Sequence, residues 1–128
     1  NLGYLKSQDF DNVYKDVEAV KRIMPNNILK VILETCYLEE DELIKASELA
    51  IKGGADFIKT STGFGTRGAS LEDIKLMKSV AKDSTKIKAS GGIKEAKTAI
   101  DYINSGVQRL GTSSGIAILK GTTSNSNY

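Results

Sequence analysis

The sequence predicts an α/β fold in which helices pack on a parallel sheet. Apolar residues alternate along the chain between helical spacing and short branched runs, and the runs recur about 22 to 30 residues apart. This interval leaves room for one helix between successive strands, the connection that parallel neighbours need. With 128 residues, the chain has the length of one domain.

Each element of the first half has its own signal. Apolar residues at helical spacing follow Ser7, a candidate N-cap, and stop at Pro25, which predicts a helix. The branched run 28–33 predicts a buried strand. Acidic residues at 39–42 suit the positive end of a helix dipole, so a second helix is predicted from there to the glycine pair 53–54.

The second half repeats this alternation. A strand is predicted at 56–61, and after a glycine-rich loop a helix opens on Ser70, with Asp73 placed as in a capping box. The remaining predicted elements are a strand at 86–90, a helix at 96–103, a strand at 108–111 and a short helix at 113–119. We expect residues 1–121 to form the folded unit and the polar residues 122–128 to form a mobile tail.

Composition narrows the chemistry that the chain can perform. The sequence contains no His, which excludes Ser-His-Asp and Cys-His arrangements and imidazole metal ligands. One cysteine, Cys36, cannot form an intrachain disulfide or a thiolate cluster, which indicates a reducing compartment such as the cytoplasm. A net charge of +2 favours neither nucleic acid nor a membrane surface as partner, and no apolar run approaches the roughly 20 residues of a membrane span.

Two lysines occupy unusual positions for charged residues. Lys59 lies in the apolar strand 56–61, where an ammonium must find a partner or lose its proton; a desolvated Lys with a lowered pKa attacks carbonyls. Lys88 takes the same place on the next strand, where its charge would lower the pKa of Lys59 further. The alternatives are that Lys59 reaches solvent or pairs with Glu34, and that Lys88 faces water on an edge strand.

Glycine-containing loops follow three of the predicted strands and could bind phosphate. Residues 63–68 spell G-x-G-x-x-G, the dinucleotide-binding pattern, although helix signals begin only at Ser70. The segments 90–93 and 111–115 offer backbone N–H groups and hydroxyls at strand ends. For any one of these loops a tight turn is the more common explanation, but two on consecutive strands beside the lysines favour an anion site.

Four strings resemble the deoxyribose-phosphate aldolase family: KVILET (30–35), ADFIKTSTGFG (55–65), KIKASGGI (86–93) and RLGTSSG (109–115). The resemblance runs in order over nearly the whole chain. It covers only strands five to eight, the C-terminal half of the family's (β/α) TIM barrel. It therefore implies that this chain is a half-barrel of about four parallel strands with helices.

The resemblance also assigns roles to residues. It implies that Lys59 forms the Schiff base, that Lys88 lowers the pKa of Lys59, and that Tyr128 assists proton transfer. It places the substrate phosphate at Gly63, Gly91, Gly92, Ser113 and Ser114. The implied reaction is the reversible cleavage of 2-deoxy-D-ribose 5-phosphate to glyceraldehyde 3-phosphate and acetaldehyde. It needs no metal or other cofactor, since the lysine imine accepts the electrons.

The resemblance leaves the state of the chain open, because the family's first four strands and its fourth-strand aspartate have no counterpart here. The chain could be a fragment of a full aldolase, a half-barrel that pairs with the missing half or a second copy, or a remnant that binds phosphate without chemistry. We expect a fragment, with weak or no activity alone. The second hypothesis for the function is a phosphate- or nucleotide-binding module built on residues 63–68, and the third is a purely structural protein.

Overall fold

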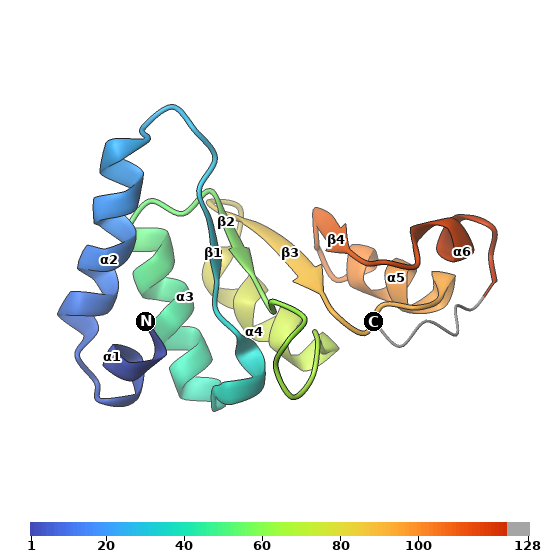
Figure 1. Cartoon of the computed structure of the whole chain (residues 1–128), viewed down its shortest axis with the longest axis horizontal. Coiled ribbons are helices and arrows are strands. Elements are labelled where there is room, and N and C mark those ends of the chain that lie inside the picture. The colour runs from blue at the N-terminus through green and yellow to red at the C-terminus, as the bar shows by residue number, and fades with distance from the viewer. Residues whose placement is uncertain (123–128) are drawn as a thin grey trace.

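The computed structural model describes residues 1–122, and its elements follow the predicted alternation (Figure 1). The helices are α1 (Leu2–Lys6), α2 (Phe10–Ile23), α3 (Glu40–Lys52), α4 (Leu71–Ala81), α5 (Ala96–Asn104) and α6 (Gly115–Leu119), with a 3₁₀ turn η1 at Thr35–Tyr37. The strands are β1 (Lys30–Ile32), β2 (Phe57–Lys59), β3 (Lys86–Ser90) and β4 (Arg109–Gly111). Within the described residues, no helix combines the length and the apolar character needed to cross a membrane.

The strands form one parallel sheet in the order β1-β2-β3-β4, which confirms the predicted α/β class. Each strand lies beside its predecessor, so the chain progresses across the molecule from the blue helices α1 and α2 to the red helix α6 (Figure 1). The strand β3 has the predicted bounds, whereas β1, β2 and β4 are shorter than predicted. Hydrogen bonding nevertheless continues past β1 and β2, because Leu33 N–H donates to the Lys59 carbonyl and Thr35 N–H to the Thr60 carbonyl.

One face of the sheet is apolar and packs on helices. Ile58 of β2 and Ile87 of β3 are registered neighbours, and both side chains are completely buried, with 0% exposure. They belong to the core cluster with α3 and α4, whose inward residues include the predicted Leu43 and Ile74. Burying this face supplies the main driving force for folding.

The opposite face carries a set of cations that we call the cationic face: Lys30, Lys59, Lys86, Lys88 and Arg109. Because side chains alternate along a strand and registered residues share a side, the pairings Lys30↔Phe57, Phe57↔Lys86 and Lys88↔Arg109 put these groups together. The Phe57 ring is 2% exposed, and its centroid lies 5.4 Å from Lys30 Nζ and 4.8 Å from the Arg109 guanidinium carbon. This face is therefore polar and charged, unlike the helix-covered face.

Two local predictions need correction. Ser7 is not the N-cap of α2, because a short helix α1 precedes it and ends there; Asp9 caps α2 instead, accepting from Asn12 N–H at 3.3 Å. Ser70 does cap α4 by accepting from Asp73 N–H at 3.1 Å. The Asp73 carboxylate, however, turns away to Arg67, so the capping box is half formed.

Candidate active site

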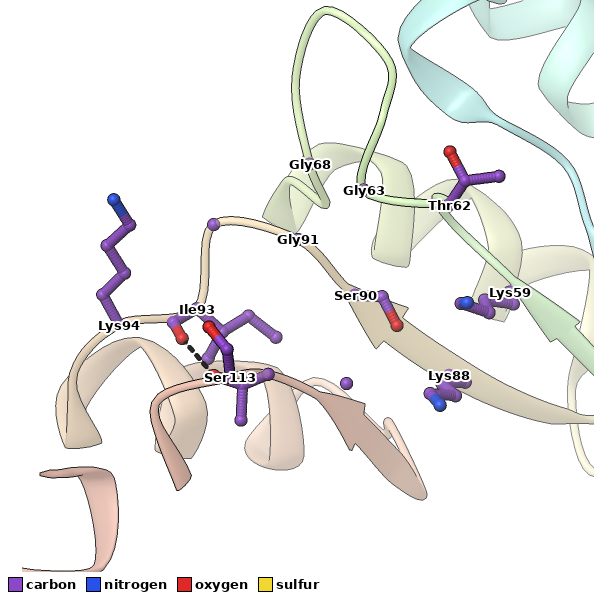
Figure 2. A pocket seen from close by; sticks show the side chains of 13 residues that line it. Lys59, Thr62, Gly63, Gly68, Lys88, Ser90, Gly91, Ile93, Lys94 and Ser113 are labelled. Atoms are coloured by element: carbon purple, nitrogen blue, oxygen red, sulfur yellow. Dashed lines mark hydrogen bonds between the residues drawn. The ribbon is translucent and has the colours of Figure 1, made fainter. Parts of the chain in front are cut away.

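A cavity of about 460 Å³ opens where the strands β2, β3 and β4 end (Figure 2). Its lining residues are Lys59, Thr62, Gly63, Gly68, Lys88, Ser90, Gly91, Gly92, Ile93, Lys94, Gly111, Thr112 and Ser113. The carboxyl ends of parallel strands are where α/β proteins place their active sites. The cavity therefore coincides with the rim on which the sequence predicts a site.

The two predicted lysines are direct neighbours in this cavity. Lys59 and Lys88 are registered partners on β2 and β3, and adjacent strands lie about 4.8 Å apart. Both side chains are half-buried, and within residues 1–122 neither ammonium makes a hydrogen bond or an ion pair. Burial lowers the pKa of Lys59 most, the charge of Lys88 lowers it further, and Lys30 adds to the effect. The surroundings of Lys59 thus lower its pKa below that of an ordinary lysine.

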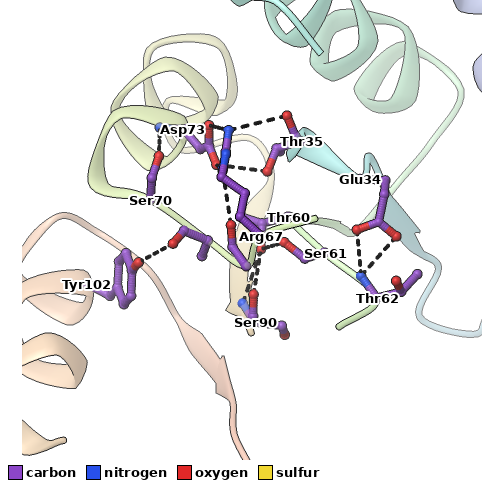
Figure 3. A network of polar contacts seen from close by, with 12 residues as sticks. Glu34, Thr35, Thr60, Ser61, Thr62, Arg67, Ser70, Asp73, Ser90 and Tyr102 are labelled. Carbon is purple, nitrogen blue, oxygen red and sulfur yellow. Dashed lines mark hydrogen bonds and ion pairs between the residues drawn. The ribbon is translucent and has the colours of Figure 1, made fainter. Parts of the chain in front are cut away.

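Glu34 opposes this effect on Lys59 only weakly. Its negative charge raises the pKa of Lys59, but less than burial and the two lysines lower it. The Glu34 carboxylate is engaged elsewhere, because Thr62 N–H donates to its two oxygens at 3.1 and 3.2 Å (Figure 3). Among the described residues, the alternative of a Lys59–Glu34 ion pair is therefore not realised, and Glu34 instead anchors the loop after β2.

The predicted glycine loops meet on the other side of the cavity. Gly63, Gly91 and Gly92 all line it. Gly91 and Gly92 have φ values of +84° and +75°, in the left-handed region that favours glycine. Gly91 also lies against Gly68, since a Cβ on Gly91 would be 2.8 Å from the Gly68 Cα. Close-packed glycine turns beside cationic side chains suit an anionic ligand.

The loop after β4 is hydrogen-bonded to the segment that follows the glycine pair, and of its two serines only Ser113 lines the cavity. Thr112 Oγ1 donates to the Ile93 carbonyl at 2.6 Å and accepts from Ser114 N–H at 2.9 Å. Ser113 lines the cavity, whereas Ser114 is buried beside it and is not among the lining residues. Tyr128 lies outside the described residues.

Two cavity residues were not singled out from the sequence. Thr62 and Lys94 line the site, and Figure 2 shows Lys94 across the cavity from the lysine pair; Thr112 also lines it and belongs to the predicted segment 111–115. Lys94 follows the glycine pair and adds a cation at the end where the loops meet. Its position directly after a predicted anion loop is the signal that could have identified it. No group of three or more acidic or cysteine side chains suited to a metal ion occurs in the described part of the chain.

Gly111 makes room for the side chains around Lys88. It is registered with Ser90, and a Cβ at Gly111 would lie 2.3 Å from Ser90 Oγ and 3.0 Å from Lys88 Cε. Thr60 Oγ1 fixes the Ser90 backbone, accepting from Ser90 N–H at 3.1 Å. The Lys88 side chain thus reaches the cavity past a position that has no side chain.

Comparison with known proteins identifies relatives of this arrangement. A protein named deoxyribose-phosphate aldolase from Carboxydothermus hydrogenoformans is 48% identical over 132 residues, which cover 100% of this chain and 58% of that protein. One of the same name from Clostridioides difficile is 52% identical over 120 residues, covering 94% of this chain and 55% of that protein. The chain therefore spans about half the length of the curated relatives it matches.

Solved structures show the same relationship. The structure described as QR15, an aldolase, superposes with a TM-score of 0.87 at 51% identity, covering 94% of this chain and 54% of its own. The tetrameric deoxyribose phosphate aldolase from Aeropyrum pernix gives a TM-score of 0.77 at 31% identity, covering 84% of this chain and 47% of its own. The four-stranded sheet thus corresponds to about half of a TIM-type barrel, as predicted. Because the sequence model of the DeoC/LacD family aldolases matches residues 1–122, this chain belongs to that family.

Proposed function

We propose that this chain carries the Schiff-base part of a class I aldolase site that cleaves 2-deoxy-D-ribose 5-phosphate reversibly. The observation that carries the proposal is the placement of Lys59. Its amine lies in a cavity directly beside Lys88, and burial and the neighbouring charge lower its pKa. The neutral form of a lysine is the nucleophile that carbonyl chemistry requires, and a lowered pKa increases the share of that form.

The reaction follows from this amine. Neutral Lys59 adds to the carbonyl carbon C1 of the open-chain sugar, and loss of water gives the iminium. A base removes the proton of the C3 hydroxyl, and the C3–O pair forms the new aldehyde as the C2–C3 bond breaks. The electron pair of that bond forms the C1=C2 bond of an enamine, while the π pair of the iminium moves to its nitrogen. Glyceraldehyde 3-phosphate leaves. Protonation of the enamine at C2 and hydrolysis then release acetaldehyde and restore the free lysine.

The other proposed groups bind and orient the substrate. Gly63, Gly91, Gly92 and Ser113 line the cavity and would bind the phosphate, with Ser114 beside them; Figure 2 shows Gly91 and Ser113 away from the lysine pair. Lys88 would keep Lys59 deprotonated, and Tyr128 would assist proton transfer at C2.

The assembly of the site is also part of the proposal. We expect the chain to work with the other half of the barrel or in an oligomer, and to show weak or no turnover alone, because it spans about half of its relatives. The Aeropyrum pernix relative is described as tetrameric. The reducing cytoplasm is the proposed location, on the evidence of a single cysteine that is free in the structure.

Borohydride trapping tests the proposal. The chain is incubated with deoxyribose 5-phosphate and reduced with borohydride. Its intact mass is then measured, and peptide mapping locates the adduct. We expect one adduct, on Lys59, which Lys59→Leu abolishes. Lys86→Leu is a matched control, because Lys86 shares the cationic face but does not line the cavity. An adduct spread over surface lysines, or none, would contradict the proposal, and retained phosphate binding without an adduct would favour a simple phosphate-binding module.

A further inference from the structure

Behind the glycine turns lies an ion pair that the proposed reaction does not use. Arg67 donates to both carboxylate oxygens of Asp73, at 2.5 Å from Nη1 and 3.0 Å from Nη2 (Figure 3). Asp73 is 5% exposed and also accepts from Thr35 Oγ1 at 2.8 Å. Burial would raise the pKa of Asp73, but the hydrogen bonds from Arg67 and Thr35 outweigh it and lower that pKa. The carboxylate is therefore charged, and its two-point pairing fixes the plane of the guanidinium.

The same guanidinium holds the backbone of the loop that precedes α4. Arg67 Nη1 donates to the Gly68 carbonyl at 3.0 Å, and Nη2 reaches the Thr35 carbonyl at 3.4 Å. The next residue, Ala69, is held from two sides: its N–H donates to the Ser90 carbonyl at 3.0 Å, and its carbonyl accepts from Tyr102 Oη at 2.7 Å. Gly68 thus lies on a segment tied to β3, α4 and α5.

Gly68 transmits this restraint to the cavity. A Cβ on Gly68 would lie 2.2 Å from the Gly91 carbonyl oxygen, so the two backbones are packed with no space between them. Both glycines line the cavity, whereas Arg67 lies on the far side of the loop, in a separate pocket between α3 and α4. A displacement of Gly68 would therefore displace Gly91, although Arg67 itself does not line the cavity.

From these contacts we infer that Arg67 is a positioning residue for phosphate, which holds Gly68 against Gly91 through its ion pair with Asp73. The inference rests on the proposed function in one respect, the assignment of phosphate to the glycine turns. A lysine could not replace Arg67 fully, because a single ammonium cannot pair with two carboxylate oxygens and a carbonyl in one plane.

The test measures binding of inorganic phosphate to the 128-residue chain by titration of backbone amide signals, so it requires no lysine chemistry. We expect Arg67→Ala to weaken binding about tenfold and Arg67→Lys to recover part of the loss. Tyr102→Phe, which removes only the hydroxyl on the Ala69 carbonyl, should weaken binding about threefold. Lys45→Ala is the control, since it breaks an exposed ion pair with Glu48 far from the cavity and should leave phosphate affinity unchanged.

Several outcomes would overturn the inference. A merely structural ion pair predicts that Arg67→Ala lowers the urea midpoint while the folded protein binds phosphate as before. Unchanged affinity in both Arg67→Ala and Tyr102→Phe, or no phosphate binding by the unaltered chain, would refute the positioning role. The two proposals have separate readouts: the borohydride adduct requires the Lys59 amine, whereas the positioning role requires that phosphate affinity depends on the Arg67–Asp73 ion pair. An adduct on Lys59 with phosphate affinity independent of Arg67 would leave only the aldolase proposal standing.

Discussion

Replacing Gly111 by Ala tests the packing that positions Lys88. Gly111 is not among the residues with positive φ, so its backbone accepts a side chain and any cost arises from contacts. The new methyl would lie 2.3 Å from Ser90 Oγ, 3.1 Å from Ser90 Cβ and 3.0 Å from Lys88 Cε. The lysine methylene belongs to a long side chain that can move aside, whereas the Ser90 hydroxyl can move only by rotating about one bond inside a buried site.

The expected cost follows from these distances. Inserting one carbon into a packed site costs about 1–3 kcal/mol, and the Ser90 hydroxyl is much too close to stay in place, so we expect Gly111→Ala to lower the free energy of unfolding by about 2 kcal/mol. Ser90→Ala removes the atom at 2.3 Å and leaves only the two milder contacts. In the double variant, the penalty of the added methyl should therefore fall below about 1 kcal/mol.

Urea unfolding of the four proteins measures this coupling. The double-mutant cycle should give an interaction energy of about 1–2 kcal/mol in favour of the double variant. Purely additive effects of Gly111→Ala and Ser90→Ala would refute the reasoning, because they would mean that the new methyl does not meet the hydroxyl.

Two further predictions concern charge. Lys88→Met should raise the pKa of Lys59, because the neighbouring positive charge that lowers it is lost, although the larger effect of burial remains. The pH profile of borohydride trapping should then shift to higher pH, whereas Lys86→Met should leave the profile in place. An unshifted profile for Lys88→Met would contradict the role assigned to Lys88. Asp73→Asn should destabilise the fold by about 2 kcal/mol at neutral pH, since the carboxylate accepts charged hydrogen bonds from Arg67. Because the folded state lowers the pKa of Asp73, this advantage of the wild type is present above about pH 4 and is lost as pH falls through the folded pKa; equal gaps in urea unfolding at pH 7 and pH 3 would count against it.

Local patterns were sufficient to predict the sheet and the lysine pair. Branched apolar runs indicate buried strands at any position, and parallel register brings equivalent positions of successive strands together, so Lys59 and Lys88 had to meet. The helix α1 was missed because its five residues carry no measurable periodicity and no glycine or serine loop marks where it begins, as the loop 111–115 does for the equally short α6. Ser7 was misassigned for the same reason, since its preference for helix ends does not say which end it occupies.

The polar network could not be predicted, because its members are joined by the path of a loop. The sequence indicates that Asp73 is the second residue of a capping box. Only the fold places the Arg67 side chain against it. Thr35 joins the same carboxylate from an element 38 residues away. Contacts of this kind depend on loop conformation, for which the sequence carries no periodic signal.

The cationic face has a consequence for how this half of a barrel can be closed. Two copies laid face to face would oppose ammonium and guanidinium groups of like sign around two Phe57 rings, and removing such charges from water without counter-charges is strongly unfavourable. A surface that covers this face must place carboxylates opposite Lys30, Lys86 and Arg109. Encounter with such an acidic surface is accelerated at low ionic strength and slowed once salt screens charges beyond about 10 Å. Self-pairing through this face has the reverse salt dependence, so the sign of that dependence distinguishes a complementary half from a second copy.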